Sequence, residues 1–153
     1  MHVYVAAHAA SLAAENALGG SKKLDLSVLP RVTFTSPAVA SVGLTEQEAR
    51  DTGLEPLVSK LPLEHVPRAL AARDTRGFVK LVADAATRHI VGAQIVAAEA
   101  GEMIIEPTLA VRFGLTIDDL TSTLHPYLTL LEGIKLAALT FEKDVATLSC
   151  CAV

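Results

Sequence analysis

Two neighbouring segments of this chain have a strong strand pattern, and the gap between them is short. Residues 77–84 read GFVKLVAD and alternate two sets of side chains, as a half-buried strand does. Residues 89–96 read HIVGAQIV and are rich in β-branched side chains. Since residues 85–88 suffice for a tight turn, the two segments are expected to form a β-hairpin and thus an antiparallel sheet.

Segments on both sides of the hairpin complete the predicted secondary structure. Strands or extended segments are expected at residues 31–34, 38–43 and 57–63, with a polar crossing at 67–75. Apolar spacing, caps and glycine stops predict helices at residues 3–18, 45–51, 101–114, 116–120 and 129–148. This order predicts an α+β fold in which helices pack on one face of an antiparallel sheet.

Local signals at two helix starts and one helix interior refine this prediction. Thr45 with Glu48, and Thr129 with Glu132, have the spacing of a capping box, in which each residue binds the backbone amide of the other. Pro107 lies in the middle of residues 101–114, where an interior proline costs a helix roughly 3 kcal/mol. The proline therefore conflicts with a continuous helix over that range.

Composition excludes several classes of protein. Hydrophobic residues make up 51% of the chain and charged residues 20%, which argues against disorder. The net charge of −4 argues against a nucleic-acid binder, which normally carries a basic face. No apolar run approaches the roughly 18 residues that a membrane helix needs. Residues 3–14 lack the basic start of a secretion signal, so a cytoplasmic location is expected.

Cys150 and Cys151 are the only cysteines, and they are adjacent. Neighbouring cysteines cannot form a disulfide without strain, because the small ring opposes a planar trans peptide. In the reduced state, two thiolates near a chain end would suit a soft metal ion. The alternative is that they are two incidental thiols.

A second group of candidate residues lies between the last two predicted helices. His125 and Tyr127 flank a proline, and Glu132 follows at the start of the final helix. A phenol can donate or accept a hydrogen bond, and as a phenolate it can bind a metal. Taken alone, His125 could equally be an ordinary loop histidine and Glu132 only a capping residue. The chain contains no GxGxxG, P-loop, GxSxG or HExxH motif.

Several motifs together resemble the dimerisation domain of the flavin-dependent pyridine-nucleotide disulfide oxidoreductases. They cover residues 31 to about 143, and they read TFTSPAVASVGLTEQEA at 33–49, PRA at 67–69, TRGFVKL at 75–81, IVGAQI at 90–95 and AGEMI at 100–104. The resemblance implies the α+β dimerisation fold and a homodimer through residues 101–143. It also implies FAD and NADPH in the full-length enzyme, with neither cofactor expected in this chain.

The C-terminal sequences HPYLTLLEGIKLAA at 125–138 and LSCCA at 148–152 resemble the mercury(II)-reducing branch of that family. Aligned on Glu132, Tyr127 falls where other members have their catalytic-base histidine, and His125 falls on an earlier histidine. The resemblance implies that Cys150 and Cys151 capture Hg(II) and pass it to the other subunit, with Tyr127 as a further ligand. It makes Tyr127, Glu132 and His125 the catalytic candidates.

The same resemblance divides the chain into three parts. Residues 1–30 are expected to be a remnant of an FAD-domain helix with a connector, 31–143 the dimerisation domain, and 144–153 a dithiol tail. Without the cofactor domains, the chain alone would be inactive. The alternatives are a stand-alone dimeric module that binds soft metals without redox activity, and the dimerisation domain of another flavin disulfide reductase.

Overall fold

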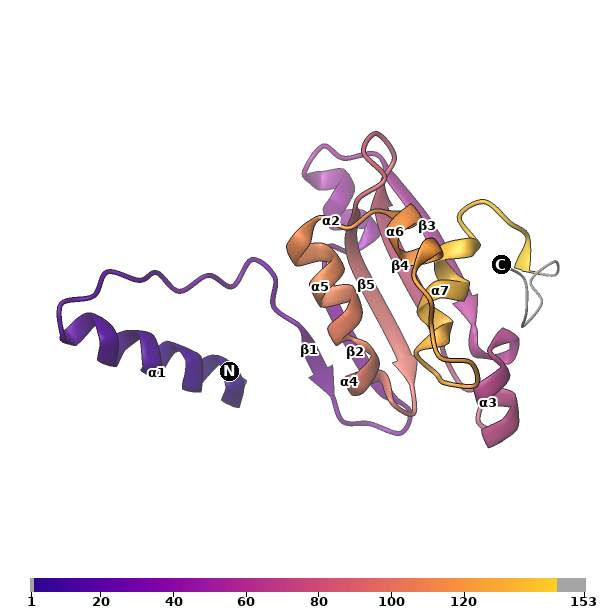
Figure 1. Cartoon of the computed structure of the whole chain (residues 1–153), viewed down its shortest axis with the longest axis horizontal. Helices are drawn as coiled ribbons and strands as arrows, with labels where there is room; N and C mark the ends of the chain where they lie inside the picture. The colour runs from indigo at the N-terminus through magenta and orange to yellow at the C-terminus, as the bar shows by residue number, and fades with distance from the viewer. Residues whose placement is uncertain (1, 146–153) are drawn as a thin grey trace.

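A five-stranded antiparallel sheet forms the centre of the computed structural model, which describes residues 2–145 (Figure 1). The strand order is β1-β2-β5-β4-β3. The strands are β1 Arg31–Thr33, β2 Ala38–Gly43, β3 Pro56–Pro62, β4 Phe78–Asp84 and β5 Ile90–Ala97. The predicted hairpin is confirmed as β4 paired with β5, and every neighbouring pair is antiparallel.

One helix precedes these strands, and the others connect or cover them. The helices are α1 Val3–Ala17, α2 Glu46–Asp51, α3 Pro67–Ala72, α4 Ala100–Met103, α5 Ile105–Phe113, α6 Ile117–Ser122 and α7 Glu132–Leu139, with a 3-10 turn at Leu63–His65. The capping box of Thr45 and Glu48 is present at the start of α2. In the described part of the chain, no helix is long and apolar enough to cross a bilayer.

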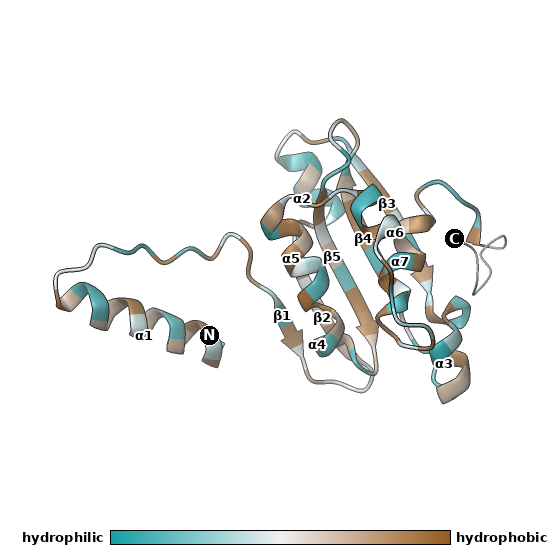
Figure 2. Cartoon of the chain, in the orientation of Figure 1, coloured by the Kyte–Doolittle hydropathy of each residue, from teal (hydrophilic) through white to brown (hydrophobic). Residues whose placement is uncertain are grey.

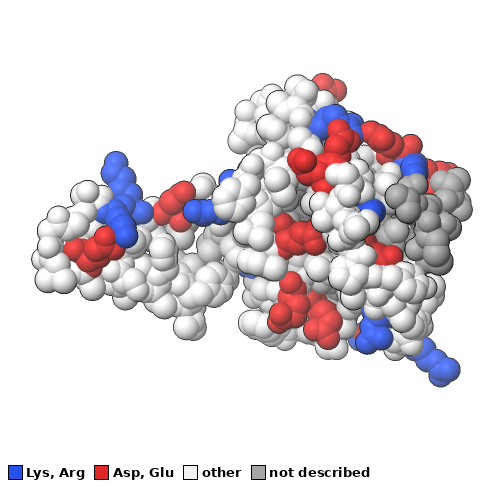
Figure 3. Space-filling view, viewed as in Figure 1, with Lys and Arg blue, Asp and Glu red and all other residues white. Residues whose placement is uncertain are grey.

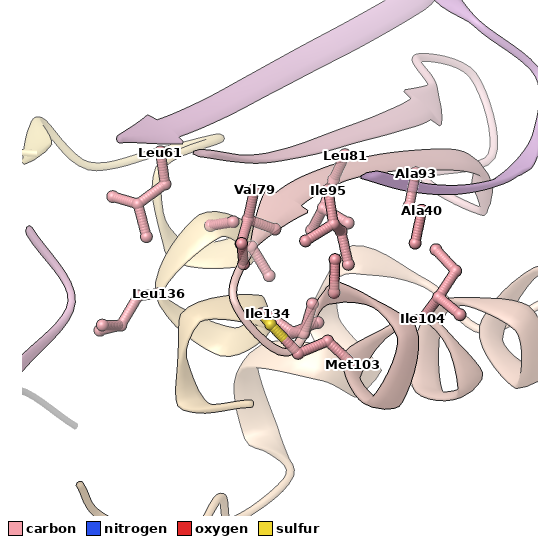
Figure 4. Packing of buried hydrophobic residues seen from close by; sticks show 14 of the residues in the cluster. Ala40, Leu61, Val79, Leu81, Ala93, Ile95, Met103, Ile104, Ile134 and Leu136 are labelled. Carbon is pink, nitrogen blue, oxygen red and sulfur yellow. The ribbon is translucent and has the colours of Figure 1, made fainter. Parts of the chain in front are cut away.

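The core lies between one face of the sheet and the helices α4, α5 and α7 (Figure 4). Alternate residues of β4 and β5, such as Val79, Leu81 and Ile95, are fully buried against Met103 and Ile134. The predicted α+β fold with helices on one sheet face is therefore confirmed. The short helix α2 lies on the other side, where its Glu46 pairs with Lys80 of β4 at 3.2 Å.

Pro107 does not lie inside a continuous helix, so the helix predicted over 101–114 is wrong in that respect. The chain breaks at Ile104 into α4 and α5, and Pro107 becomes the third residue of α5. The first backbone amides of a helix have no partner within it, so the missing N–H of proline loses little there. Gly114 ends α5 in the left-handed conformation, with φ of 64°, as predicted.

Two other predicted segments also differ. The crossing expected at 67–75 contains α3, which starts with Pro67 at a position that favours proline. The final helix is shorter than 129–148, because α7 spans only Glu132–Leu139. Phe141 and Val145 still pack on the core after the helix has ended, and Leu148 lies outside the described residues.

The helix α1 stands apart from the sheet and its covering helices (Figure 1). It matches the predicted helix 3–18 within one residue at its end, yet none of its residues is buried. Residues 18–30 join it to β1 without helix or strand. The Tyr4 hydroxyl donates a hydrogen bond to the Pro30 carbonyl across this connection.

Candidate functional site

The loop between α6 and α7, together with the first residue of α7, carries three of the predicted site residues. Thr116 and Asp119 form a capping box that starts α6, and α6 packs on α7. His125 and Tyr127 lie in the loop, and Glu132 is the first residue of α7. The structure thus brings these three residues into one segment, while Cys150 and Cys151 lie outside the described residues.

His125 is bound on both sides of its ring. Its side chain is only 3% exposed, and Nε2 lies 2.8 Å from Oε1 of Glu106 in α5. Nδ1 lies 3.1 Å from the carbonyl oxygen of Thr123. Because a carboxylate and a carbonyl can only accept, both ring nitrogens donate when these contacts are made, which requires the imidazolium form.

The electrostatics of this loop agree with that assignment. The hydrogen bond to Glu106 raises the pKa of His125 above its ordinary value, and the Thr123 carbonyl adds to the effect against desolvation and the charge of Lys135. Acidic side chains gather on the side of the molecule where α4 and α5 lie (Figure 3). Among these carboxylates, Glu106 is the one that favours a positive charge on His125.

Glu132 does not pair with His125 among the hydrogen bonds of residues 2–145. Its side chain is buried, and Oε2 accepts from the backbone amide of Leu128 at 3.2 Å. Its own amide donates to the Thr129 hydroxyl, so one half of the predicted capping box is confirmed and the other half is wrong. Leu128 adopts a left-handed conformation with φ of 63°, which turns its amide into the loop where the carboxylate can accept it.

Tyr127 is presented at the surface between these anchored positions. The residue as a whole is 59% exposed. No group of three or more His, Cys, Asp or Glu residues suitable for a metal ion occurs within the described residues. The roles of Tyr127, Glu132, His125 and the two cysteines therefore stay predictions.

Sequence reasoning missed Glu106 as a partner of His125. Glu106 lies directly before Pro107, in the first turn of α5. Once Pro107 is taken as a marker of a helix start, an acidic residue in that first turn could have been expected from the helix dipole. Its contact with His125, however, depends on a tertiary approach of two segments 19 residues apart.

The described residues lack the recognised arrangement that binds a flavin or nicotinamide dinucleotide. Such a cofactor places its pyrophosphate at a helix start that follows a glycine-rich turn. None of the described helices starts after such a turn. No step of chemistry is therefore assigned to FAD or NADPH on these residues.

A second surface is formed by the exposed side of α5. Ile105, Leu109 and Phe113 are spaced four residues apart and thus share one side of the helix. They are 55%, 45% and 68% exposed, and Leu124 is 86% exposed. The apolar residues on α5 can be followed in Figure 2. A row of large apolar side chains of this kind is typical of a protein–protein contact.

Titration of His125 should reveal its pairing with Glu106. We expect a pKa above the ordinary histidine value, and a lower pKa in Glu106→Gln, because the neutral amide no longer favours the imidazolium. Since the pKa is raised in the folded state, the stability gained from this pair is full below the unfolded pKa and is lost as the pH rises through the folded pKa. NMR titration of the imidazole signals, assigned by their loss in His125→Gln, measures this.

Glu102→Gln is the matched control for that titration, since Glu102 is an exposed carboxylate on the neighbouring helix α4. An equal fall of the His125 pKa in both variants would assign the shift to the general acidity of this side of the molecule. The pairing with Glu106 would then be contradicted.

Comparison with protein families gives one match that covers most of the domain. A family described as "Pyridine nucleotide-disulphide oxidoreductase, dimerisation domain" matches residues 29–138. The range includes all five strands and most of α7. The resemblance predicted from the motifs is confirmed by this match.

Similar curated proteins and solved structures agree with this family match. The chain is 59% identical to a mercuric reductase of Bacillus cereus and 57% identical to one of Lysinibacillus sphaericus, in each case over 98% of this chain. It spans 24% and 28% of those relatives, about a quarter of their length. Among structures, LpdA of Mycobacterium tuberculosis superposes with a TM-score of 0.76 at 29% identity, over 86% of this chain and 29% of LpdA. The flavoprotein disulfide reductase RclA of Escherichia coli gives 0.75 at 27% identity, over 82% of this chain and 30% of RclA.

Proposed function

Because the chain belongs to the pyridine nucleotide-disulphide oxidoreductase family as a dimerisation domain, we propose that it is the dimerisation domain of a mercury(II) reductase. The observation that carries this proposal is the identity of 51–59% to curated mercuric reductases over 98% of this chain. The RclA and LpdA structures, at 27% and 29% identity, support the fold but are much more distant in sequence.

In this proposal the complete enzyme works in the cytoplasm and reduces Hg(II) to Hg(0). NADPH supplies the two electrons through FAD, and both cofactors belong to the part of the enzyme outside the dimerisation domain. Residues 1–30 would be the end of the FAD domain and its connector, 31–143 the dimerisation domain, and 144–153 the metal-capturing tail.

The contribution of this chain is to collect and deliver the metal ion. Hg(II) is a soft ion and prefers thiolate ligands, so Cys150 and Cys151 would bind it first. The tail would then pass it to the other subunit of the homodimer. Tyr127 would assist as an oxygen ligand during transfer, since a phenolate can bind a metal ion and the residue lies 59% exposed on the loop. His125 and Glu132 would hold the loop in place.

The homodimer would form through residues 101–143, with the exposed side of α5 at its centre. Aromatic and aliphatic side chains at the centre of an interface supply most of its affinity. Phe113, with Leu109 and Ile105 beside it, has the exposure and spacing that such a centre needs. A second copy of the chain is the partner that the family's dimerisation role implies.

A chimeric enzyme tests the proposed function. Residues 3–153 would replace the equivalent quarter of the Bacillus cereus mercuric reductase, to which the chain is 59% identical. We expect Hg(II)-dependent oxidation of NADPH near the parental rate, because the grafted domain would restore both the dimer and the metal-capturing tail. Cys150→Ser/Cys151→Ser should lower this rate by at least about 10-fold when a competing thiol is present, since hydroxyls are poor ligands of a soft ion.

Each alternative function has its own outcome. A stand-alone soft-metal module would bind Hg(II) in anaerobic titration of the isolated chain, while the chimera would show no turnover. A domain from another disulfide reductase would give a folded chimera with flavin reduction by NADPH but no dependence on Hg(II) or on the two cysteines. Either result would contradict the proposal.

A further inference from the structure

The exposed side of α5 continues onto α4 as one stripe of side chains, with opposite charges at its two ends. We propose that two copies of the chain pack this stripe antiparallel, so that Glu102 of each copy faces Arg112 of the other. This arrangement rests on the homodimer of the proposed function, to which it adds a direction and a register.

The stripe lies on one side of a nearly continuous helical segment. Its members, three or four residues apart and all exposed, are Glu102, Ile105, Leu109 and Arg112. This spacing places side chains on the same face of a helix. α4 leads directly into α5 (Figure 1), and the interruption at Ile104 keeps the helical phase. The Ile104 amide donates to the Ala100 carbonyl at 3.1 Å, and the Thr108 amide donates to the Ile104 carbonyl at 3.0 Å.

The two charged ends of the stripe have no ionic partner in the part of the chain that the structure describes. Within residues 2–145, the side chains of Glu102 and Arg112 make no hydrogen bond or ion pair. Arg112 is only the smallest cause that lowers the pKa of Asp25, which is lowered mainly by hydrogen bonding with Ser27. Covering a charge without pairing it is costly. A partner that covers the apolar centre of the stripe therefore has to bring a positive group to Glu102 and a negative group to Arg112.

The order of residues makes the stripe complementary to itself. Glu102 and Arg112 lie five residues before and after Pro107, and Ile105 and Leu109 lie two residues before and after it. In a two-fold dimer, if one residue contacts a second, the second contacts the first in return. Antiparallel packing about Pro107 thus brings each Glu102 to an Arg112 and each Ile105 to a Leu109. Parallel packing would bring like charges together, which disfavours association.

The charges beside the stripe favour the same direction. Glu99 and Glu106 lie near Glu102 at the acidic end, and Arg112 is the only basic residue of α4 and α5. Figure 3 shows the acidic side chains gathered where these helices lie. An arginine from the second copy would reduce the repulsion among these carboxylates, whereas the acidic end of that copy would increase it.

Charge reversal tests the arrangement. Arg112→Glu and Glu102→Arg should each raise the dimer dissociation constant by roughly 10-fold at low salt, because each variant places like charges opposite one another at both ends of the interface. The double variant Glu102→Arg/Arg112→Glu restores opposite charges and should return to within about 3-fold of the parent. Sedimentation equilibrium of the whole chain measures the three constants.

Arg73→Glu is the matched control, since it makes the same charge change at an exposed residue after α3, and it should stay within about 2-fold of the parent. A double variant that is no tighter than the single variants would overturn the antiparallel pairing but leave the homodimer intact. A parent chain that is monomeric at every concentration would contradict both the pairing and the homodimer.

Cross-linking tests the direction independently of charge. Chains with Ile105→Cys and chains with Leu109→Cys, both in a Cys150→Ser/Cys151→Ser background, would be mixed and mildly oxidised. A disulfide needs Cα atoms within about 7 Å of each other, so antiparallel stripes should give mainly covalent dimers with one chain of each kind. Mass spectrometry identifies them, and a majority of dimers joined through the same position would overturn the proposal.

Discussion

Replacing Gly92 by alanine should destabilise the domain by about 3 kcal/mol, although alanine is a conservative change in most strands. Gly92 lies in the central strand β5, opposite Gly43 of β2 and Val82 of β4. A Cβ at this position would come within 1.9 Å of the carbonyl oxygen of Leu44 and 2.7 Å of its amide nitrogen. Leu44 cannot move away freely, because its amide donates to Val91 at 2.9 Å. Urea denaturation at fixed protein concentration measures the change in free energy of unfolding.

Gly53→Ala is the matched control for this prediction. Gly53 has φ of 85°, and an added Cβ would meet no atom within 4 Å. Its substitution should therefore cost only the backbone strain of a left-handed alanine, about 1 kcal/mol. Equal losses at the two positions would show that the close approach of Leu44 to β5 is not what requires glycine there.

The second large effect is expected on self-association. Phe113→Asp should raise the dimer dissociation constant by roughly 30-fold, equivalent to about 2 kcal/mol, because it places a charge in the apolar row on α5, at the last residue of the helix. Phe113 is 68% exposed, so the folded monomer should lose little stability. Sedimentation equilibrium over a range of concentrations gives the dissociation constant.

Leu70→Asp is the corresponding control for association. Leu70 is 56% exposed but lies on α3, outside the residues assigned to the interface. The two variants should differ clearly in dissociation constant. A monomeric parent chain, or an equal effect of the two substitutions, would contradict an interface centred on α5.

The strands could be predicted because their signals are local. The alternation in β4 and β5, the short turn between them and the capping box at Thr45 depend on neighbouring residues, and all three are present in the structure. The structure differs from the predicted secondary structure where tertiary packing, rather than local sequence, determines the conformation. Residues 67–75 look polar, yet Ala69 is fully buried and α3 forms around it. Phe141 and Val145 keep the apolar spacing of a helix but pack on the core after α7 has ended.

The candidate site was predictable to a smaller extent. The motif names His125, Tyr127 and Glu132, which lie close together in the sequence, and their roles stay predictions. The hydrogen bonds of that segment could not be deduced, because they depend on how α5 approaches the loop. Glu106, rather than Glu132, lies within hydrogen-bond distance of His125. The buried Glu132 accepts from the backbone amide of Leu128 instead.

The separation of α1 from the sheet has a consequence for how fast backbone amides exchange with solvent deuterium. A helix of 15 residues is marginal in water unless tertiary contacts stabilise it, and α1 buries none of its residues. Its amides should exchange at the earliest times, whereas those of β5, which is hydrogen-bonded on both sides, should persist until the sheet itself opens. We therefore expect two classes of amide in the exchange data, a slow class in the sheet domain and a fast class in α1.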